Sequence, residues 1–416
     1  MQLFGESLML EKAFIQGTHR MRAPEETITQ FRPLMGRLGI TRLANLTGLD
    51  TIGLPTWMAV RPNAKGLSTS QGKGITHAAA QASALMESIE SWHAEMIVRP
   101  VRIGALHDMR SSEPVCSVRE LSRYADRPLR DDLAISWIEG RRLVDDTPCW
   151  VPWETVSTDY TVPPGDIGET LFVQSSNGLA GGNHLAEAVF HALTELVERD
   201  AVAHTEHQFR RADPARRIRL ETVTAPHLRA LLAMLDAADI EVVLFDLTVD
   251  TGVPVCGCTI LDRESTLRWR VLPHFSGYGC HLSPDVALAR AITEAVQSRV
   301  TYIAGSRDDI TAQEYRRGGH VDDLDNYRRL AAEGESAVDF SAIADRATRC
   351  FGQDIAIVQD ALSAVGVDEV IAIDLRRDDL GVPVVKVVAP RLAAPMSMIR
   401  GRPIVNPQRR HAGHRQ

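Results

Sequence analysis

The sequence lacks several features that would assign it to a common class of protein. None of its six cysteines belongs to a CxxC pair, and their spacing does not fit a zinc ribbon. The N-terminus has no basic segment followed by an apolar one, so no secretory signal is visible. No apolar run approaches the roughly 20 residues that span a bilayer. These absences predict a cytoplasmic protein with reduced thiols and no membrane partner.

Basic residues are also scarce. The chain has 46 Lys and Arg residues against 54 Asp and Glu residues, which gives a formal net charge of −8. A nucleic-acid-binding protein normally carries a basic face, so we predict no nucleic-acid partner. An acidic balance is compatible with metal binding, although most acidic proteins simply have solvated acidic surfaces. With 416 residues, 44% of them hydrophobic, the chain is long enough for one large domain or two closely associated units.

Familiar catalytic motifs are absent. There is no GxSxG, no HExxH and no GxGxxG after a predicted strand. Residues 66–76 (GLSTSQGKGIT) resemble a phosphate loop, but the glycine spacing is wrong and Gly74 stands where Ser or Thr should follow the lysine. Lys73 therefore fits either a phosphate contact or an ordinary loop position. The lack of a nucleophile favours phosphoryl transfer, which depends mainly on positioning and charge neutralisation.

Internal repetition is the most informative feature that the sequence does contain. Four segments combine an apolar run, an acidic turn and a proline early in the next apolar run, namely residues 46–60, 141–152, 245–258 and 373–388. Asp and Gly favour the turn, and proline is tolerated at a strand start or edge. We predict four β-hairpins that belong to one antiparallel sheet system built by duplication.

Three further segments share a helical pattern. They read SALMESIE (83–90), HALTELVE (191–198) and RAITEAVQ (290–297), with a common order of polar, Ala, aliphatic and Glu positions. Their apolar residues recur with the period of an amphipathic helix. The prediction is an α+β fold in which helices pack on mainly antiparallel sheets, built from internally repeated hairpin–helix units.

Each of these helices gathers polar residues on one face, because positions i, i+4 and i+7 lie on the same side of a helix. The residues are Ser83, Glu87, Glu90, His191, Glu195, Glu198, Arg290, Glu294 and Gln297, with Glu187 one turn earlier in the second helix. An exposed glutamate face usually carries Lys or Arg partners. None occurs between Lys73 and Arg99, or between Arg142 and Arg199. A solvated face explains any one helix, but three matching faces indicate a shared site.

Converging carboxylates without cationic partners repel one another, and a divalent cation is the simplest compensation. Oxygen ligands favour magnesium over zinc, and magnesium usually completes its shell with water and phosphate oxygens. Arg199 and Arg290 can then contact phosphate through their planar guanidinium groups. His191 fits either a general base or a hydrogen-bonding spacer. The cluster predicts a metal–phosphate site.

At these residues the sequence resembles the YcaO family of ATP-using enzymes that modify peptide backbones. The matching segments are residues 70–90, 175–201 and 288–299, and residues 18–62 resemble the N-terminal portion of stand-alone members. The resemblance implies an ATP site without a P-loop in a YcaO-like catalytic domain, which we place at residues 1–400, followed by a flexible basic tail at 401–416. It implies ATP and Mg²⁺ as cofactors.

Carried onto this chain, the resemblance and the residue pattern give two predicted sets. The metal set is Glu87, Glu90, Glu195, Glu198 and Glu294. The nucleotide set is Lys73, Ser83, Glu187, Arg199, Arg290 and Gln297. Family members phosphorylate a backbone amide oxygen, so that attack by a Cys, Ser or Thr side chain gives an azoline and attack by sulfide gives a thioamide.

The choice between these products depends on the two ends of the chain. Azoline-forming members typically end in a proline-rich PxPxP-like tail, whereas residues 401–416 contain only Pro403 and Pro407. The N-terminal portion is more similar to members that act with a TfuA-type partner. We therefore predict thioamidation of a ribosomally made peptide or protein, with a TfuA-like partner or sulfur donor, and leave a homodimer open. The alternatives are an azoline-forming cyclodehydratase, a non-catalytic scaffold that binds a leader peptide or partner, and a small-molecule ligase or kinase.

Overall fold

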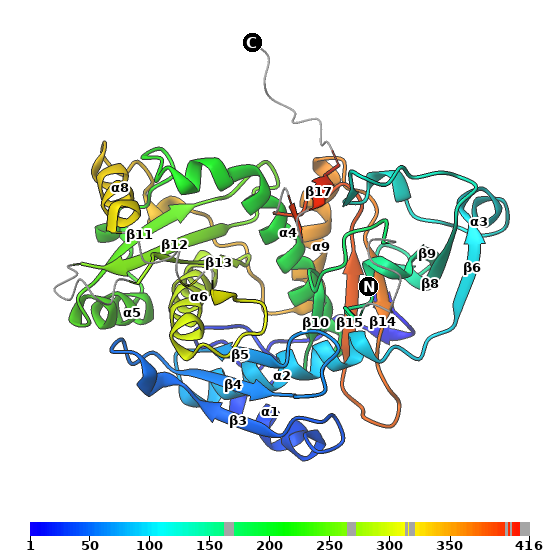
Figure 1. The fold of residues 1–416 in the computed structure, drawn as a ribbon, viewed down its shortest axis with the longest axis horizontal. Helices are drawn as coiled ribbons and strands as arrows, with labels where there is room; N and C mark the ends of the chain where they lie inside the picture. The colour runs from blue at the N-terminus through cyan, green and yellow to red at the C-terminus, as the bar shows by residue number, and fades with distance from the viewer. Residues whose placement is uncertain are drawn as a thin grey trace, which may run out of the picture.

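Separate antiparallel sheets carry long helices that meet near the middle of the molecule (Figure 1). The computed structural model describes residues 1–161, 170–263, 272–312, 315, 321–395, 398–399 and 402–407. Within this part of the chain, none of the helices has the length and apolar character needed to cross a membrane. The predicted α+β class, with helices packed on antiparallel sheets, is confirmed.

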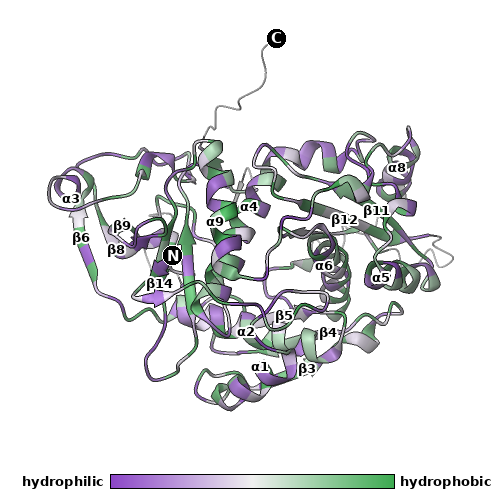
Figure 2. Ribbon diagram, turned by 180° about the vertical axis from the view of Figure 1, so that it is seen from behind, coloured by the Kyte–Doolittle hydropathy of each residue, from purple (hydrophilic) through white to green (hydrophobic). Residues whose placement is uncertain are grey.

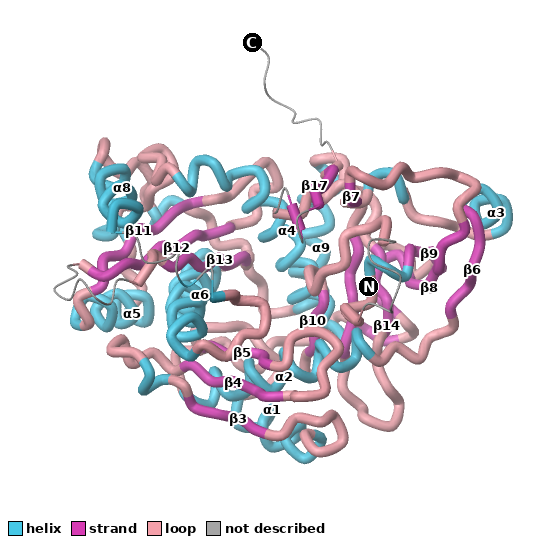
Figure 3. The backbone as a smooth tube through the Cα atoms, in the orientation of Figure 1, coloured by secondary structure: helices cyan, strands magenta, loops and turns pink. Residues whose placement is uncertain are grey.

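Two three-stranded sheets are each followed by one of the predicted helices. The first contains β3 (Arg42–Asn45), β4 (Thr56–Val60) and β5 (Thr69–Lys73) and leads into α2 (His77–Glu95). The second contains β11 (Ile240–Asp246), β12 (Val255–Asp262) and β13 (Phe275–Cys280) and leads into α6 (Pro284–Ala304). Loops, pink in Figure 3, connect these units to the rest of the chain.

A six-stranded sheet forms the third unit. Its strands are β10 (Leu179–Gly181), β15 (Val384–Val388), β14 (Ile371–Asp374), β8 (Ala134–Arg142) and β6 (Val101–Ala105) in spatial order, with β9 (Pro148–Pro152) paired to β8. Helix α4 (Leu185–Arg210) follows β10, and α9 (Phe351–Ala364) packs beside it. The described part of the chain also contains the α-helices α1 (Pro24–Phe31), α3 (Leu106–Ser112), α5 (Pro226–Ala237) and α8 (Val321–Ala332). The remaining short strands are β1 (Gln2–Leu3), β2 (Glu6–Ser7), β7 (Arg123–Tyr124), β16 (Met398–Ile399) and β17 (Arg402–Val405).

The predicted hairpins correspond to the antiparallel pairs β3–β4, β8–β9, β11–β12 and β14–β15. The prediction misplaces the first hairpin, because β3 ends at Asn45, before the predicted segment 46–60, and Thr47–Leu49 form a short 3-10 helix instead of a strand. The prediction that the four hairpins form one sheet system is wrong, because only β8–β9 and β14–β15 share a sheet. Strand and turn signals are local, whereas the choice of neighbouring hairpin depends on contacts between distant segments. An origin by duplication stays a prediction.

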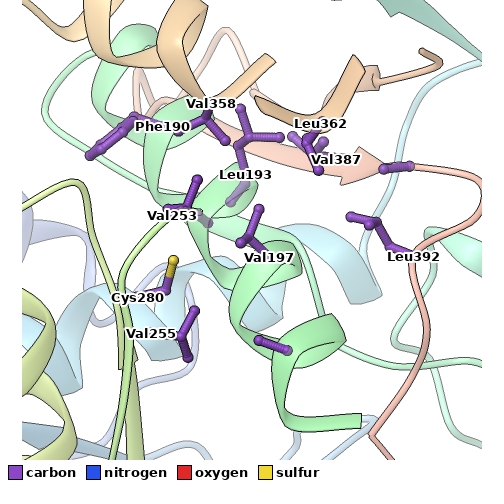
Figure 4. Packing of buried hydrophobic residues seen from close by; sticks show 14 of the residues in the cluster. Phe190, Leu193, Val197, Val253, Val255, Cys280, Val358, Leu362, Val387 and Leu392 are labelled. Atoms are coloured by element: carbon purple, nitrogen blue, oxygen red, sulfur yellow. The ribbon is translucent and has the colours of Figure 1, made fainter. Parts of the chain in front are cut away.

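The core forms around α4. Phe190, Leu193 and Val197 of this helix belong to the same buried cluster as Val358 and Leu362 of α9 (Figure 4), and all five side chains are buried. Figure 2, coloured by the hydropathy of each residue, shows apolar residues on α9 and β12 and polar residues along α8. Burying each such side chain contributes about 1.5–3 kcal/mol relative to leaving it exposed. This burial fixes α4 in the interior of the molecule. The acidic face of α4 takes no part in this apolar packing and can line a site.

Helices α2 and α6 contact their strands backbone to backbone. A Cβ atom on Gly72 of β5 would lie 2.1 Å from the Ala80 carbonyl oxygen of α2. On β13, a Cβ atom on Gly277 would lie 2.3 Å from the Ala291 carbonyl oxygen of α6. Such distances exclude any side chain at these positions, so glycine is required for the close approach.

The predicted flexible tail is ordered at its start. Arg402–Val405 form β17, which pairs with both β16 and β7. The guanidinium of Arg402 also contacts the Asp126 carboxylate at 2.8 Å. The prediction of a flexible segment from residue 401 is therefore wrong for residues 402–405, while residues 408–416 lie outside the described part of the chain.

Candidate functional site

A cavity of about 800 Å³ lies between α2, α4, α6, β5 and the N-terminal segment. All eleven residues predicted for the metal and nucleotide sets line it. They come from positions as far apart in the chain as Lys73 and Gln297, and the three helices present their acidic faces to the same space. The structure thus brings the predicted residues together, and their individual roles stay predictions.

Helix α4 contributes Glu195, Glu198 and Arg199 to the lining of the cavity. Glu198 is only 1% exposed, and its Oε2 atom has no hydrogen-bond partner among the described residues. Burial raises the pKa of this carboxyl, although the Arg199 guanidinium lies 3.5 Å away. Glu195 accepts a hydrogen bond from the Gly178 backbone N–H at 3.0 Å. The glycine-rich segment before α4 therefore donates to a carboxylate of the site.

Two carboxylates of α2 carry raised pKa values. Enclosure by the surrounding protein, together with Glu90, raises the pKa of Glu87 to about 8, even though its side chain is open to the cavity. Burial raises the pKa of Glu90 to about 7, despite a hydrogen bond donated by the Gly181 N–H at 2.7 Å. No described basic side chain lies within ion-pair distance of either carboxylate. Both groups would gain from a nearby cation.

Helix α6 contributes a paired acid and an unpaired base. Glu294 forms an ion pair with Lys73, and Lys73 and Arg199 hold its pKa below the ordinary value although burial opposes this. The Arg290 guanidinium has no described carboxylate within 4.0 Å and donates instead to Nε2 of His191 at 3.2 Å. Gln297 donates to the backbone oxygen of Gln71 at 2.7 Å.

Glu187 lines the cavity but already has partners. Its carboxylate accepts a hydrogen bond from the Met21 backbone N–H at 2.9 Å and contacts the Arg20 guanidinium at 3.4 Å. The premise that the acids lack cationic partners therefore holds for Glu87 and Glu90 but is wrong for Glu187 and Glu294. It is also wrong for Glu195 and Glu198, which lie 3.7 and 3.5 Å from the Arg199 guanidinium. The partners of Glu187 and Glu294 belong to distant segments, and sequence spacing shows only local ones.

The charges of the cavity fit a complex of magnesium and phosphate. Glu87 and Glu90 have raised pKa values and no cationic partner among the described residues, the pKa of Glu198 is raised despite Arg199, and Arg290 has no described carboxylate partner. No three His, Cys, Asp or Glu side chains of the described residues are arranged as a complete metal site. Magnesium commonly takes only one or two protein carboxylates and completes its shell with water and phosphate oxygens. The side chains of Glu87, Glu90 and Glu198 suit that mode of binding.

Sequence reasoning missed three cations of the cavity, Arg20, Arg22 and Arg307. Arg307 follows the end of α6, where Gly305 adopts a left-handed conformation with φ of 60°. Asp309 binds its guanidinium, and Asp308 accepts a hydrogen bond from the Ser68 backbone N–H at 2.8 Å. The available sequence signal for Arg307 was the Arg-Asp-Asp run at residues 307–309, shortly after α6. The predicted site was built from polar residues within the three helices, so it did not include residues beyond the end of a helix.

Without a bound metal, the raised carboxyl pKa values should make the protein less stable as the pH rises. A group whose pKa is higher in the folded state binds more protons there, so its contribution is lost as the pH rises from about 4.5 through the folded-state value near 8 for Glu87. Buried His19 and His281 have lowered pKa values and act in the opposite direction below 6.5. The effect of Glu87 is therefore best seen between about pH 6.5 and 8.

Thermal unfolding in a chelating buffer measures this prediction. We expect the unfolding temperature of the wild-type chain to fall across that pH range, and the Glu87→Gln variant to show a smaller decline. Parallel curves for the two proteins would show that Glu87 titrates normally in the folded state.

With the geometry established, comparisons identify the family. A family model described as YcaO cyclodehydratase, ATP- and Mg²⁺-binding, matches residues 71–393. The chain belongs to the YcaO family. A Methanothermobacter thermautotrophicus protein is 35% identical over 373 residues, covering 89% of this chain and 94% of the relative. A Rhizobium leguminosarum bv. trifolii protein encoded in the tfuA 3′ region is 33% identical over 388 residues, covering 91% of this chain and 89% of the relative.

The fold comparison agrees with this assignment. The structure of YcaO from Methanopyrus kandleri, bound with AMPPCP and Mg²⁺, superposes with a TM-score of 0.73 at 24% identity, covering 92% of this chain and 94% of that one. At this identity the likeness shows the shared fold. The predicted family is confirmed, and the predicted cofactors, ATP and Mg²⁺, agree with the description of the family.

Proposed function

We propose that the protein uses ATP and magnesium to activate a backbone amide of a ribosomally made peptide or protein, leading to a thioamide. The observation that carries this proposal is the combination, in one cavity, of carboxylates with raised pKa values and an arginine without a described carboxylate partner. Glu87 and Glu90, which have no cationic partner among the described residues, and Glu198, whose pKa is raised by burial despite Arg199, offer negative charge to a metal ion, and Arg290 offers positive charge to a phosphate. Bound Mg–ATP supplies the transferable phosphoryl group.

The proposed reaction balances as an exchange of oxygen for sulfur. A sulfide nucleophile adds to the amide carbonyl carbon, and the resulting oxyanion takes the γ-phosphoryl group of ATP with release of ADP. Loss of inorganic phosphate breaks the carbon–oxygen bond, the sulfur-bound proton is released, and a carbon–sulfur double bond remains. The protein's part is to hold the nucleotide and to neutralise phosphate charge, which is how phosphoryl transfer is mainly accelerated.

One observation favours thioamidation over azoline formation. The relative from Rhizobium is encoded beside tfuA, which supports a TfuA-like partner for this chain. The partners we propose are a precursor peptide or protein and a TfuA-like protein or other sulfur donor. A cytoplasmic location and a homodimer also belong to this proposal.

An azoline-forming cyclodehydratase is the second candidate, because the matching family model is described as a cyclodehydratase. In that reaction a Cys, Ser or Thr side chain of the peptide replaces sulfide. The two products differ in mass. Exchange of oxygen for sulfur raises the peptide mass, whereas cyclisation lowers it by one water.

Calorimetry followed by mass spectrometry tests the proposal. We expect AMPPCP to bind in the presence of Mg²⁺ and to bind much more weakly in its absence. Incubation with ATP, a sulfide donor, a TfuA-like protein and a short peptide encoded beside the gene should then raise the peptide mass. Failure to bind AMPPCP with Mg²⁺ would favour the non-catalytic scaffold, and ATP turnover with a small molecule but no peptide would favour a ligase or kinase.

A further inference from the structure

Arg290 differs from the other half-buried cations that line the cavity. A further cation of the lining, Arg22, is exposed and donates to Gln30. The half-buried cations Arg20, Lys73, Arg199 and Arg307 each form an ion pair with a carboxylate. Arg290 is also half-buried, but in the described part of the chain it has no carboxylate partner. Its Nη1 atom donates to Nε2 of His191, and its Nε atom is buried without a partner among the described residues.

The contact fixes the protonation state of His191. A guanidinium group can only donate hydrogen bonds, so the Nε2 atom of the imidazole must accept and carry no proton. Burial, followed by the positive charge of Arg290, lowers the pKa of His191 well below its usual value, and the ring is neutral near pH 7. The single ring proton is then on Nδ1, which is buried and has no hydrogen-bond partner among the described residues.

This arrangement excludes a role for His191 as a general base. The lone pair of Nε2 is occupied by Arg290, and Nδ1 holds the proton in a position closed to solvent. A base must reach the proton that it removes through a free lone pair. The sequence leaves two roles open for His191, general base or hydrogen-bonding spacer, and the geometry supports the second.

A neutral acceptor orients a guanidinium without cancelling its charge. A carboxylate at the same position would bind Arg290 more strongly, but it would also neutralise the cation and repel phosphate. We propose that His191 is a positioning residue that directs Arg290 toward the phosphate groups of the nucleotide while leaving its full positive charge available. This inference rests on the proposed function, because it requires an anionic ligand in the cavity.

Three substitutions separate orientation from charge. His191→Gln keeps an acceptor, His191→Leu removes it at similar volume, and His191→Glu keeps an acceptor but adds a negative charge. The matched control is His207→Glu, which adds the same charge at an exposed position farther along α4. The probe is AMPPCP with Mg²⁺, and its dissociation constant is measured by calorimetry at pH 7.5.

We expect the affinities to follow the role of each side chain. His191→Gln should bind within about threefold of wild type, and His191→Leu about tenfold more weakly, as for loss of a hydrogen bond to a charged group. His191→Glu should bind about a hundredfold more weakly, because it pairs with Arg290. His207→Glu should bind like wild type.

Thermal unfolding without ligand distinguishes positioning from packing. If His191 only supports the fold, affinity should follow stability across the three variants, and this result would overturn the inference. Wild-type affinity in His191→Leu, or equal affinity in His191→Glu and His191→Gln, would also overturn it. Absence of binding in the wild-type chain would instead remove the proposed function itself, so the two failures are distinguishable.

Discussion

Replacing Glu87 or Glu198 with glutamine should abolish magnesium-dependent ATP consumption while leaving the protein folded. Glutamine keeps the shape of the side chain but cannot neutralise a divalent cation. Removal of one metal ligand of this kind should lower metal affinity or activity by about a hundredfold or more. The two side chains line the cavity but differ in exposure, since Glu87 is exposed and Glu198 is buried. Release of phosphate from ATP measures the effect.

Stability provides the control for this prediction. Burial raises the pKa of both carboxyls, so in metal-free buffer near neutral pH each substitution should leave the unfolding temperature unchanged or higher. The matched variant is Glu206→Gln, which changes a carboxylate on α4 outside the cavity and should consume ATP normally. Near-normal ATP consumption in both Glu87→Gln and Glu198→Gln would remove the assignment of these residues to the metal.

Substituting Lys12 with methionine should cause a large loss of stability, of about 3–5 kcal/mol. Lys12 forms an ion pair with Asp354 in which both side chains are fully buried. Its Nζ atom also donates to the backbone oxygen of Thr348 at 2.9 Å. Methionine would leave the Asp354 charge buried without compensation, and urea unfolding measures the difference in free energy.

A double variant tests the origin of that loss. Lys12→Met combined with Asp354→Asn removes both charges and should recover much of the stability of the wild-type chain. The Lys12→Met variant should also bind AMPPCP and Mg²⁺ more weakly, because the segment that Lys12 anchors carries Arg20 and Met21 to Glu187. A change of less than about 1 kcal/mol in the single variant would show that the pair does not hold this segment.

The secondary structure and the members of the site were predictable because their signals are local. The acidic turns of residues 141–152 and 373–388 and the helical period of residues 191–198 are read within a few residues. The shared pattern of three helices also predicted correctly that their acids line one space.

The pairing within that space was not predictable. Lys73 and Glu294 are 221 positions apart, and Arg20 and Glu187 are 167 positions apart. Such contacts depend on how distant segments pack, and spacing along one helix does not contain that information. For the same reason, the sequence did not predict that β15 lies between β10 and β14 or that residues 402–405 form a strand.

The direct contact of α2 and α6 with glycine positions of their strands limits how the cavity can change shape. Gly72 and Gly277 have no side chains that could change conformation if a helix shifted along its strand. We therefore expect each helix and its strand to move together as one rigid unit. Adjustment to an incoming ligand must then come from the segments that border the cavity without belonging to these units, namely residues 14–22 and 305–310. The positions of Glu87 and Glu294 relative to the strands on which their helices pack are thereby set before any ligand arrives.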